Sequence, residues 1–268
     1  LGIGKKPLPF AVNRRLCRWL LQEGGNDSIF AHCFLTITWN LMCRSKNTIN
    51  INRQHISWKD DCMTVMFAHS KTDPAGDKAF RERHVYANPN IPEICAVTSL
   101  ARYLACFNPS LHGPLFVGGD PYDRFRKILE KTVHQHRDEI ISLGVHPNEL
   151  GVHSIRKGAA TYVCNGTTGT VSFSAVCIRA GWTMGNVRDR YIHHESAGDH
   201  VVGRMVAGLD VLSPHFLISP HFLQRVPKLF LPSQKEMSTT QWRTPTARQW
   251  TKRKRANTCC IGSFLHPC

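Results

Sequence analysis

A change of pattern between residues 55 and 90 limits the possible folds most strongly. The sequence HISWKDDCMTVMFAHSKTDPAGDKAFRERHVYANP has β-branched and aromatic residues on either side of two polar breaks, at residues 60–61 and 73–77. Runs of this kind separated by short polar turns are typical of antiparallel hairpins. We therefore expect a three-stranded antiparallel sheet within a chain that elsewhere has helical spacing.

Apolar residues recur at helical spacing on both sides of this insert. Asn26 or Ser28 is a candidate cap for the first helix, which we expect to end near Arg44. Further helices are predicted over residues 93–107, 121–142, 153–165, 172–181 and 185–195, followed by a last helix with the apolar stripe Val201, Val202, Met205, Val206 and Leu209. The predicted fold class is α+β, mainly α-helical with a small three-stranded antiparallel sheet.

The positive charge is concentrated near the end of the sequence. The chain has 34 Lys and Arg against 19 Asp and Glu, and residues 211–268 hold nine of these cations with one acid. That region is also rich in proline and lacks a sustained apolar period. We predict a folded domain over residues 1–212 and a basic, mostly disordered tail over residues 213–268.

Composition excludes several classes of protein. No apolar stretch is long enough to span a membrane, and we expect neither a signal peptide nor a membrane partner. The odd count of 11 cysteines, without regular spacing, indicates reduced thiols in an intracellular protein. A net charge of +15 favours a polyanionic partner, above all nucleic acid. The basic run at residues 252–255 predicts a nuclear location or a phosphate-binding arm, and a solvated charge run in a cytoplasmic protein is the alternative.

Six residues with polar or ionisable side chains follow one another in a particular order. His153 and Arg156 form a His-x-x-Arg motif, and an Ala-Gly-Trp sequence ending at Trp182 comes nine residues before Tyr191. Upstream, Arg44 lies at the end of a predicted helix and Lys71 beside the second break of the predicted sheet. Each of these residues has an ordinary structural explanation when taken alone. Their order and spacing together resemble the catalytic box of the tyrosine recombinases, over roughly residues 10–210.

This resemblance implies the tyrosine recombinase catalytic fold. It also implies a site-specific recombinase or integrase that cuts and rejoins DNA through a covalent 3′-phosphotyrosine intermediate, in DNA integration or transposition. Two arginine forks would hold the phosphate, because its non-bridging oxygens gain negative charge during attack. The tyrosine would attack, the lysine would protonate the leaving 5′ oxygen, the histidine would accept a proton or bind an oxygen, and the indole N–H would donate a hydrogen bond. No metal and no nucleotide cofactor are implied. The implied catalytic residues are Arg44, Lys71, His153, Arg156, Trp182 and Tyr191.

The sequence departs from the family pattern in three respects. Asn47 stands where an acidic residue usually follows the first arginine, so we expect weaker support of the site. Only 43 residues precede Arg44, so we expect that a DNA-clamping domain either is absent or was removed from this fragment. The Ala-Gly-Trp variant and the residues around Lys71 are most similar to eukaryotic mobile-element recombinases such as the Crypton group.

The expected partners are double-stranded DNA and further copies of the chain, as a dimer or tetramer on DNA. The stripe from Val201 to Leu209 would dock on a neighbouring protomer or pack on its own domain. A zinc module is disfavoured, because Cys259 and Cys260 are adjacent and His193–His194 has no companion pair. The motif and linker of a type IB topoisomerase and the aromatic sheet motif of an RNA-recognition domain are not evident. A non-catalytic DNA-binding protein derived from a recombinase stays open as the alternative.

Overall fold

The computed structural model describes residues 4–59, 61–66, 82–165, 171–182, 198–213 and 216. The chain divides into two units, Leu1–Gln224 and Arg225–Cys268. Every described residue belongs to the first unit. Lys71, Tyr191, the helix predicted over residues 185–195 and nearly all of the predicted tail lie outside the described residues. The boundary between residues 212 and 213 stays a prediction.

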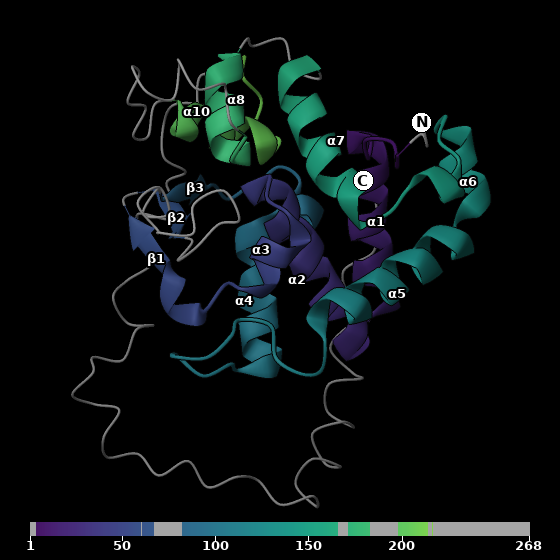
Figure 1. Ribbon diagram of the computed structural model, residues 1–268, viewed down its shortest axis with the longest axis horizontal. Coiled ribbons are helices and arrows are strands. Elements are labelled where there is room, and N and C mark those ends of the chain that lie inside the picture. The colour runs from purple at the N-terminus through teal and green to yellow at the C-terminus, as the bar shows by residue number, and fades with distance from the viewer. Residues whose placement is uncertain are drawn as a thin grey trace, which may run out of the picture. The chain divides into compact units, whose positions relative to one another are not determined.

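The described chain is mainly helical with one small sheet, which confirms the predicted fold class (Figure 1). The strands are β1 (Ile56–Lys59), β2 (Cys62–Val65) and β3 (Arg83–Val85). The helices are α1 (Phe10–Glu23), α2 (Gly25–Leu41), α3 (Ser45–Ile49), α4 (Ala96–Phe107), α5 (Pro121–Gln135), α6 (Arg137–Ser142), α7 (Val152–Asn165), α8 (Phe173–Ala180) and α10 (Asp199–Val206).

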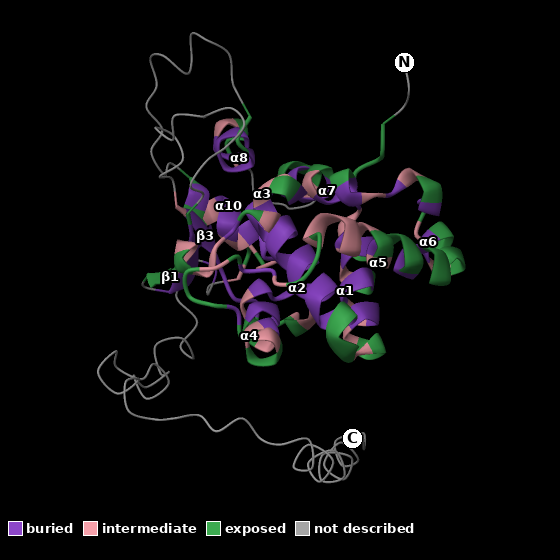
Figure 2. Ribbon diagram, turned by 60° about the horizontal axis from the view of Figure 1, so that its bottom comes forward, coloured by how far each residue is buried: buried purple, intermediate pink, exposed green. Residues whose placement is uncertain are grey.

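Helix α2 forms the centre of the core. Every residue from Ser28 to Leu41 is buried (Figure 2), as expected of a helix without a continuous polar face. It packs against α1, α4, α5 and α7. Phe34 stacks on Phe125 of α5 at a centroid distance of 4.4 Å, and the indole N–H of Trp39 donates to the carbonyl of Val206 in α10 over 3.0 Å. Helix α2 therefore connects the α5 side of the domain with the α10 side.

The sheet has the predicted antiparallel order β1-β2-β3. Met63 of β2 pairs with Trp58 on one side and with Val85 on the other. Strands β2 and β3 are buried, whereas β1 is largely exposed. Strand β3 packs against α10. Gly203 permits this approach, because a Cβ at that position would lie 2.4 Å from the carbonyl oxygen of His84.

The ends of α2 differ from the prediction. The helix begins at Gly25, and its N-cap is Gly24 at φ 69°, without a side-chain cap. Ser28 instead donates a hydrogen bond to the carboxylate of Glu23, so capping by Asn26 or Ser28 was wrong. The helix ends at Leu41 because Met42 takes the left-handed conformation, at φ 50°. The reversal at Gly24 also separates α2 from α1, a helix that the sequence analysis did not predict.

The helix predicted over residues 121–142 is two helices, α5 and α6. They meet at His136, whose φ of −110° and ψ of 31° are not helical. The His136 ring stacks on Trp19 of α1, with 3.9 Å between the ring centres and an interplanar angle of 3°. This contact with α1 favours a break that the apolar period of the sequence does not reveal.

The stripe predicted from Val201 to Leu209 packs on its own domain. Val202, Met205 and Val206 are buried in the same core as α2 and α7. The sequence left open whether this stripe docks on a neighbouring protomer or packs on its own domain. In the described structure it packs on its own domain. None of the described helices combines the length and the apolar character that crossing a membrane requires.

Candidate functional site

Four of the six residues predicted for the site are described: Arg44, His153, Arg156 and Trp182. Lys71 and Tyr191 are outside the described residues. The four come from three places in the fold, namely the junction of α2 and α3, the first turns of α7, and the end of α8.

Arg44 lies at the junction of α2 and α3, three residues later than the helix end at Leu41. It is the N-cap of α3, with φ −71° and ψ 143°, and its carbonyl accepts hydrogen bonds from the backbone N–H groups of Asn47 and Thr48. Thr48 fastens α3 to α2, because its hydroxyl lies 3.0 Å from that of Thr38. The backbone of Arg44 is therefore fixed, while its half-buried guanidinium has no hydrogen bond or ion pair with any residue that the structure describes.

Arg156 extends from α7 to the end of α8. Its Nη2 donates a hydrogen bond to the carbonyl of Ala180, and its guanidinium carbon lies 5.4 Å from the centre of the Trp182 ring. Its Nε is buried and has no hydrogen-bond partner within the described part of the chain. Buried donors are nearly always paired in folded proteins. The unpaired Nε therefore marks a place for an acceptor from a ligand or from outside the described residues.

The electrostatic environment of Arg156 also indicates a site for a negatively charged group. Burial lowers the pKa of the Arg156 guanidinium below its ordinary value, and the positive charge of Arg44 lowers this pKa further. Arginine nevertheless remains charged at any accessible pH. No carboxylate among the described residues forms an ion pair with Arg44 or Arg156. Two neighbouring cations without an anion between them form a suitable site for a phosphate or another oxyanion.

The end of α8 places Trp182 against Arg156. Gly181, at φ 66°, ends the helix in the left-handed conformation, and the N–H of Trp182 donates to the carbonyl of Cys177 over 2.9 Å. Arg83 of β3 supplies two more donors here, to the carbonyl oxygens of Ile178 and Arg179. The sequence analysis missed Arg83, since nothing in a strand sequence indicates that its arginine reaches a helix end.

His153 shares a side of α7 with Arg156, because residues three apart on a helix are neighbours. It is exposed, and it has no hydrogen bond to a residue within the described ranges. It lines a cavity of about 290 Å³ together with Lys5, Arg126 and His134. The structure thus brings Arg44, Arg156 and Trp182 together. The His153 ring is accessible on α7, and the cavity that it lines includes none of those three residues.

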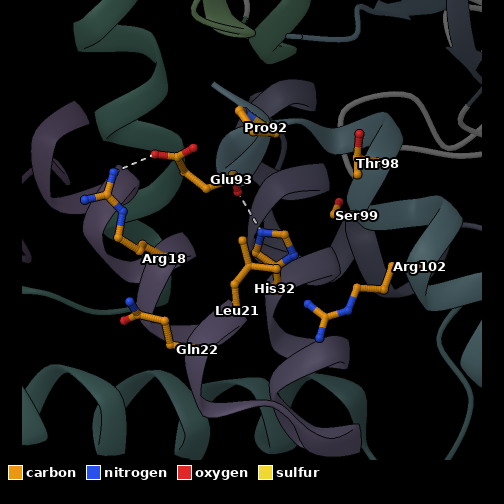
Figure 3. Close-up of a pocket in the computed structure, with 9 residues that line it drawn as sticks. All are labelled: Arg18, Leu21, Gln22, His32, Pro92, Glu93, Thr98, Ser99 and Arg102. Carbon is orange, nitrogen blue, oxygen red and sulfur yellow. Dashed lines mark hydrogen bonds and ion pairs between the residues drawn. The ribbon is translucent and has the colours of Figure 1, made fainter. Parts of the chain in front are cut away.

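A second cavity shares no lining residue with this site (Figure 3). It measures about 440 Å³ and lies among α1, α2 and α4. His32 and Glu93 form its polar wall, where a ring nitrogen of His32 lies 2.7 Å from the Glu93 carbonyl oxygen. The Glu93 carboxylate accepts hydrogen bonds from Arg14 and Arg18, each at 2.9 Å. The Glu93 carboxylate thus forms ion pairs with both Arg14 and Arg18. This cavity therefore differs from the site of Arg44 and Arg156, where no described carboxylate pairs with the arginines.

No three His, Cys, Asp or Glu side chains meet as a possible metal site within the described ranges. No disulfide joins any two of the eight cysteines in that part of the chain.

Comparisons with known proteins give no match to a family model and none to a curated protein. Among solved structures, the chain is similar to the XerH site-specific recombinase bound to difH substrate, in a pre-cleavage complex. That similarity has a TM-score of 0.49 and 14% sequence identity, and it covers 71% of this chain and 51% of the recombinase. A post-cleavage complex of XerH with a palindromic difH substrate gives the same TM-score and identity, covering 74% and 52%. The chain spans about half the length of that recombinase, and the similarity is limited to the fold.

Proposed function

We propose that this chain is the catalytic domain of a tyrosine recombinase, which cuts and rejoins double-stranded DNA in integration or transposition. The observation that carries this proposal is the proximity of two positively charged side chains, Arg44 and Arg156. The two cations are close enough for one to lower the pKa of the other, and no described carboxylate neutralises them. A phosphodiester supplies the missing negative charge.

Arg156 is held in a geometry that suits a bound oxyanion such as a phosphate. Its Nη2 is held by the Ala180 carbonyl and its face by Trp182, so the guanidinium plane is fixed before any ligand arrives. The buried Nε remains as a donor that no described residue satisfies, and a ligand oxygen would satisfy it. Donors fixed in advance around the developing charge are usually the largest contribution to a reaction of this kind. Arg44 would add a second fork from the opposite element.

The remaining steps rest on the order of residues in the sequence. The phenolic oxygen of Tyr191 forms a bond to phosphorus as the bond to the 5′ oxygen breaks. His153 accepts the phenolic proton, and Lys71 gives a proton to the leaving 5′ oxygen. Rejoining is the reverse reaction with a new 5′ hydroxyl. The phosphotyrosine conserves the bond energy, so religation needs no nucleotide cofactor, and the proposed steps use no metal.

The proposal includes the setting of the reaction. Phosphate contacts would dominate DNA affinity, so binding should weaken steeply as salt increases. The chain would act as a dimer or tetramer on DNA, and the basic run at residues 252–255 would direct it to the nucleus.

Covalent trapping tests the reaction. The protein is incubated with nicked or phosphorothiolate-containing DNA, and a protein–DNA band that resists SDS is sought. Tyr191→Phe should bind the DNA and give no band. Tyr162→Phe is the matched control, because the Tyr162 ring stacks on Phe10 at 4.2 Å and phenylalanine keeps that contact. Its band should equal that of the unmodified protein.

Two results would contradict the proposal. A band that persists in Tyr191→Phe would reject the assigned nucleophile. No band with any of the DNAs, together with salt-sensitive binding to them, would favour a non-catalytic DNA-binding protein derived from a recombinase.

A further inference from the structure

Arg179 has the most completely buried charge in the described chain, and its side chain joins three other segments. Its Nη1 forms an ion pair with the Asp199 carboxylate at the start of α10, with 2.7 Å between N and O. Its Nη2 donates to the carbonyls of Asn40 in α2 and His84 in β3, each over 2.8 Å. Its Nε also donates to Asn40, over 3.2 Å. One guanidinium therefore connects α8, α2, β3 and α10.

Asp199 completes the connection between α10 and β3. Its second oxygen accepts a hydrogen bond from the backbone N–H of His84 at 2.9 Å and lies 2.8 Å from the ring Nδ1 of the same residue. Burial alone would raise the pKa of Asp199, but the Arg179 charge and the His84 hydrogen bonds outweigh it and hold this pKa well below the ordinary value. The carboxylate is therefore ionised and fully paired.

The connected segments are those that carry the candidate catalytic residues. Asn40 comes four residues before Arg44, and Arg179 comes three residues before Trp182. Asp199 comes eight residues after Tyr191, so the Arg179–Asp199 ion pair joins the chain before Tyr191 to the chain after it. In Figure 1, α8 and α10 lie next to each other, in agreement with their packing contacts.

We propose that Arg179, together with Asp199, is a positioning residue for the recombination reaction. It fixes the end of α2, the end of α8 and the start of α10 relative to one another, and so sets the places of Arg44, Arg156, Trp182 and the chain that carries Tyr191. This inference rests on the proposed function. Arg179 touches neither the DNA nor the reacting atoms and acts only through the segments that it joins.

The role of such a buried ion pair is to fix the relative positions of the segments that it joins. A buried ion pair often contributes no more to stability than apolar residues of the same size, because both charges lose their hydration. Several fixed hydrogen bonds from one rigid fork do restrict the relative positions of the segments. Reaction rates depend steeply on such positions, since a displacement of about 1 Å can cost about 100-fold.

The test compares Arg179→Lys with Arg204→Lys. A lysine at position 179 keeps the charge, but its single ammonium cannot serve Asn40, His84 and Asp199 in the same geometry. Arg204 is the matched control, because it also forms a nearly buried ion pair from α10, with Asp61 at 2.8 Å, and contacts neither α8 nor α2 through it. Thermal unfolding, DNA affinity and the first-order rate of adduct formation at saturating protein are measured for both variants.

We expect Arg179→Lys to bind DNA within about twofold of the original and to form the adduct about 100-fold more slowly. Arg204→Lys should lose thermal stability to a similar degree and form the adduct within about threefold of the original rate. Should Arg179→Lys fail to fold, Asp199→Asn replaces it, since the amide keeps the shape of the carboxylate and loses the ion pair. It should also slow adduct formation without weakening DNA binding.

Unchanged adduct formation in Arg179→Lys or Asp199→Asn would overturn the positioning role while leaving the proposed function in place. An equal loss of rate in Arg204→Lys would also overturn it, because the effect would then follow stability alone. Failure of the unmodified protein to form any adduct would overturn the proposed function, and the positioning role with it.

Discussion

The Arg156 guanidinium lies over the Trp182 ring, 5.4 Å from the ring centre. This contact joins α7 to the end of α8 through two side chains that are 26 positions apart in the sequence. Trp182 remains 37% exposed, so the ring supports Arg156 on one side and is open on another. An indole cannot act as a base, and its contribution is therefore to hold the arginine and to donate its N–H.

Shortening Trp182 should reduce adduct formation without abolishing it. A cation–π contact of this kind contributes roughly 0.5–2 kcal/mol. We expect Trp182→Ala to slow the reaction about 10-fold and Trp182→Phe to slow it less, because phenylalanine keeps an aromatic face below Arg156. The first-order rate of covalent adduct formation measures both variants. Equal rates for the two variants and the original would contradict a supporting role for the ring.

The neighbouring charges of Arg44 and Arg156 predict an unusual relation between stability and activity. Arg44→Gln removes one of two like charges, so the protein should unfold at the same or a higher temperature while losing adduct formation by at least about 100-fold. Inorganic phosphate or sulfate should raise the unfolding temperature of the original protein.

Arg44→Gln should reduce this stabilisation by phosphate. Sodium chloride at matched ionic strength is the control for general screening. Equal stabilisation of both proteins by phosphate would show that the anion does not bind between these two arginines.

The sequence predicts the strands and most helices because their signals are local. The three-stranded order follows from β-branched and aromatic residues on either side of two polar breaks, and α7 and α8 follow from apolar spacing. The break at His136 could not be predicted in this way, because the stacking partner of that ring is Trp19, far away along the chain. The start of α2 was misplaced because two glycines at positive φ end one helix and begin the next, while polar residues nearby looked like caps.

In the site, too, the sequence reveals the local pattern of residues and does not reveal contacts between distant elements. Arg44, Arg156 and Trp182 were named from their order, and the structure adds how Arg156 is held. Arg83 and Arg179 gave no signal, since they bind backbone carbonyls of other elements and Arg179 also pairs with Asp199, 20 residues away, and no residue pattern marks such partners in advance.

Gly158 should be essential for the packing of α7. A Cβ there would lie 2.1 Å from the carbonyl oxygen of Leu8, whose N–H donates to the carbonyl of Ser154. Gly158→Ala should therefore lower the free energy of unfolding by roughly 1–3 kcal/mol, although alanine is the better helix former. Gly119→Ala is the control, because nothing lies within 4 Å of its Cβ position, and it should change stability by less than about 0.5 kcal/mol. Urea unfolding measures both variants, and equal stabilities would contradict the close approach.

Glu93 should make the stability of the domain sensitive to acid. Burial raises its pKa, but hydrogen bonds from its own backbone, Arg14 and Arg18 outweigh this and lower the pKa from 4.5 to about 2. A carboxylate with a lowered pKa in the folded state stabilises the protein above the unfolded pKa, and this contribution is lost as the pH falls from 4.5 towards 2.

Glu93→Gln should consequently be less stable than the original at pH 7, by roughly 1–3 kcal/mol, and the difference should be mostly gone by about pH 2. Glu130→Gln serves as the control, because the ion pair of Glu130 with Arg126 is exposed and such pairs contribute little, so its effect should stay below about 1 kcal/mol. Urea unfolding at the two pH values gives the free energies. A difference between Glu93→Gln and the original that stays constant with pH would show that the two arginines stabilise the domain by contacts that do not depend on the charge of Glu93.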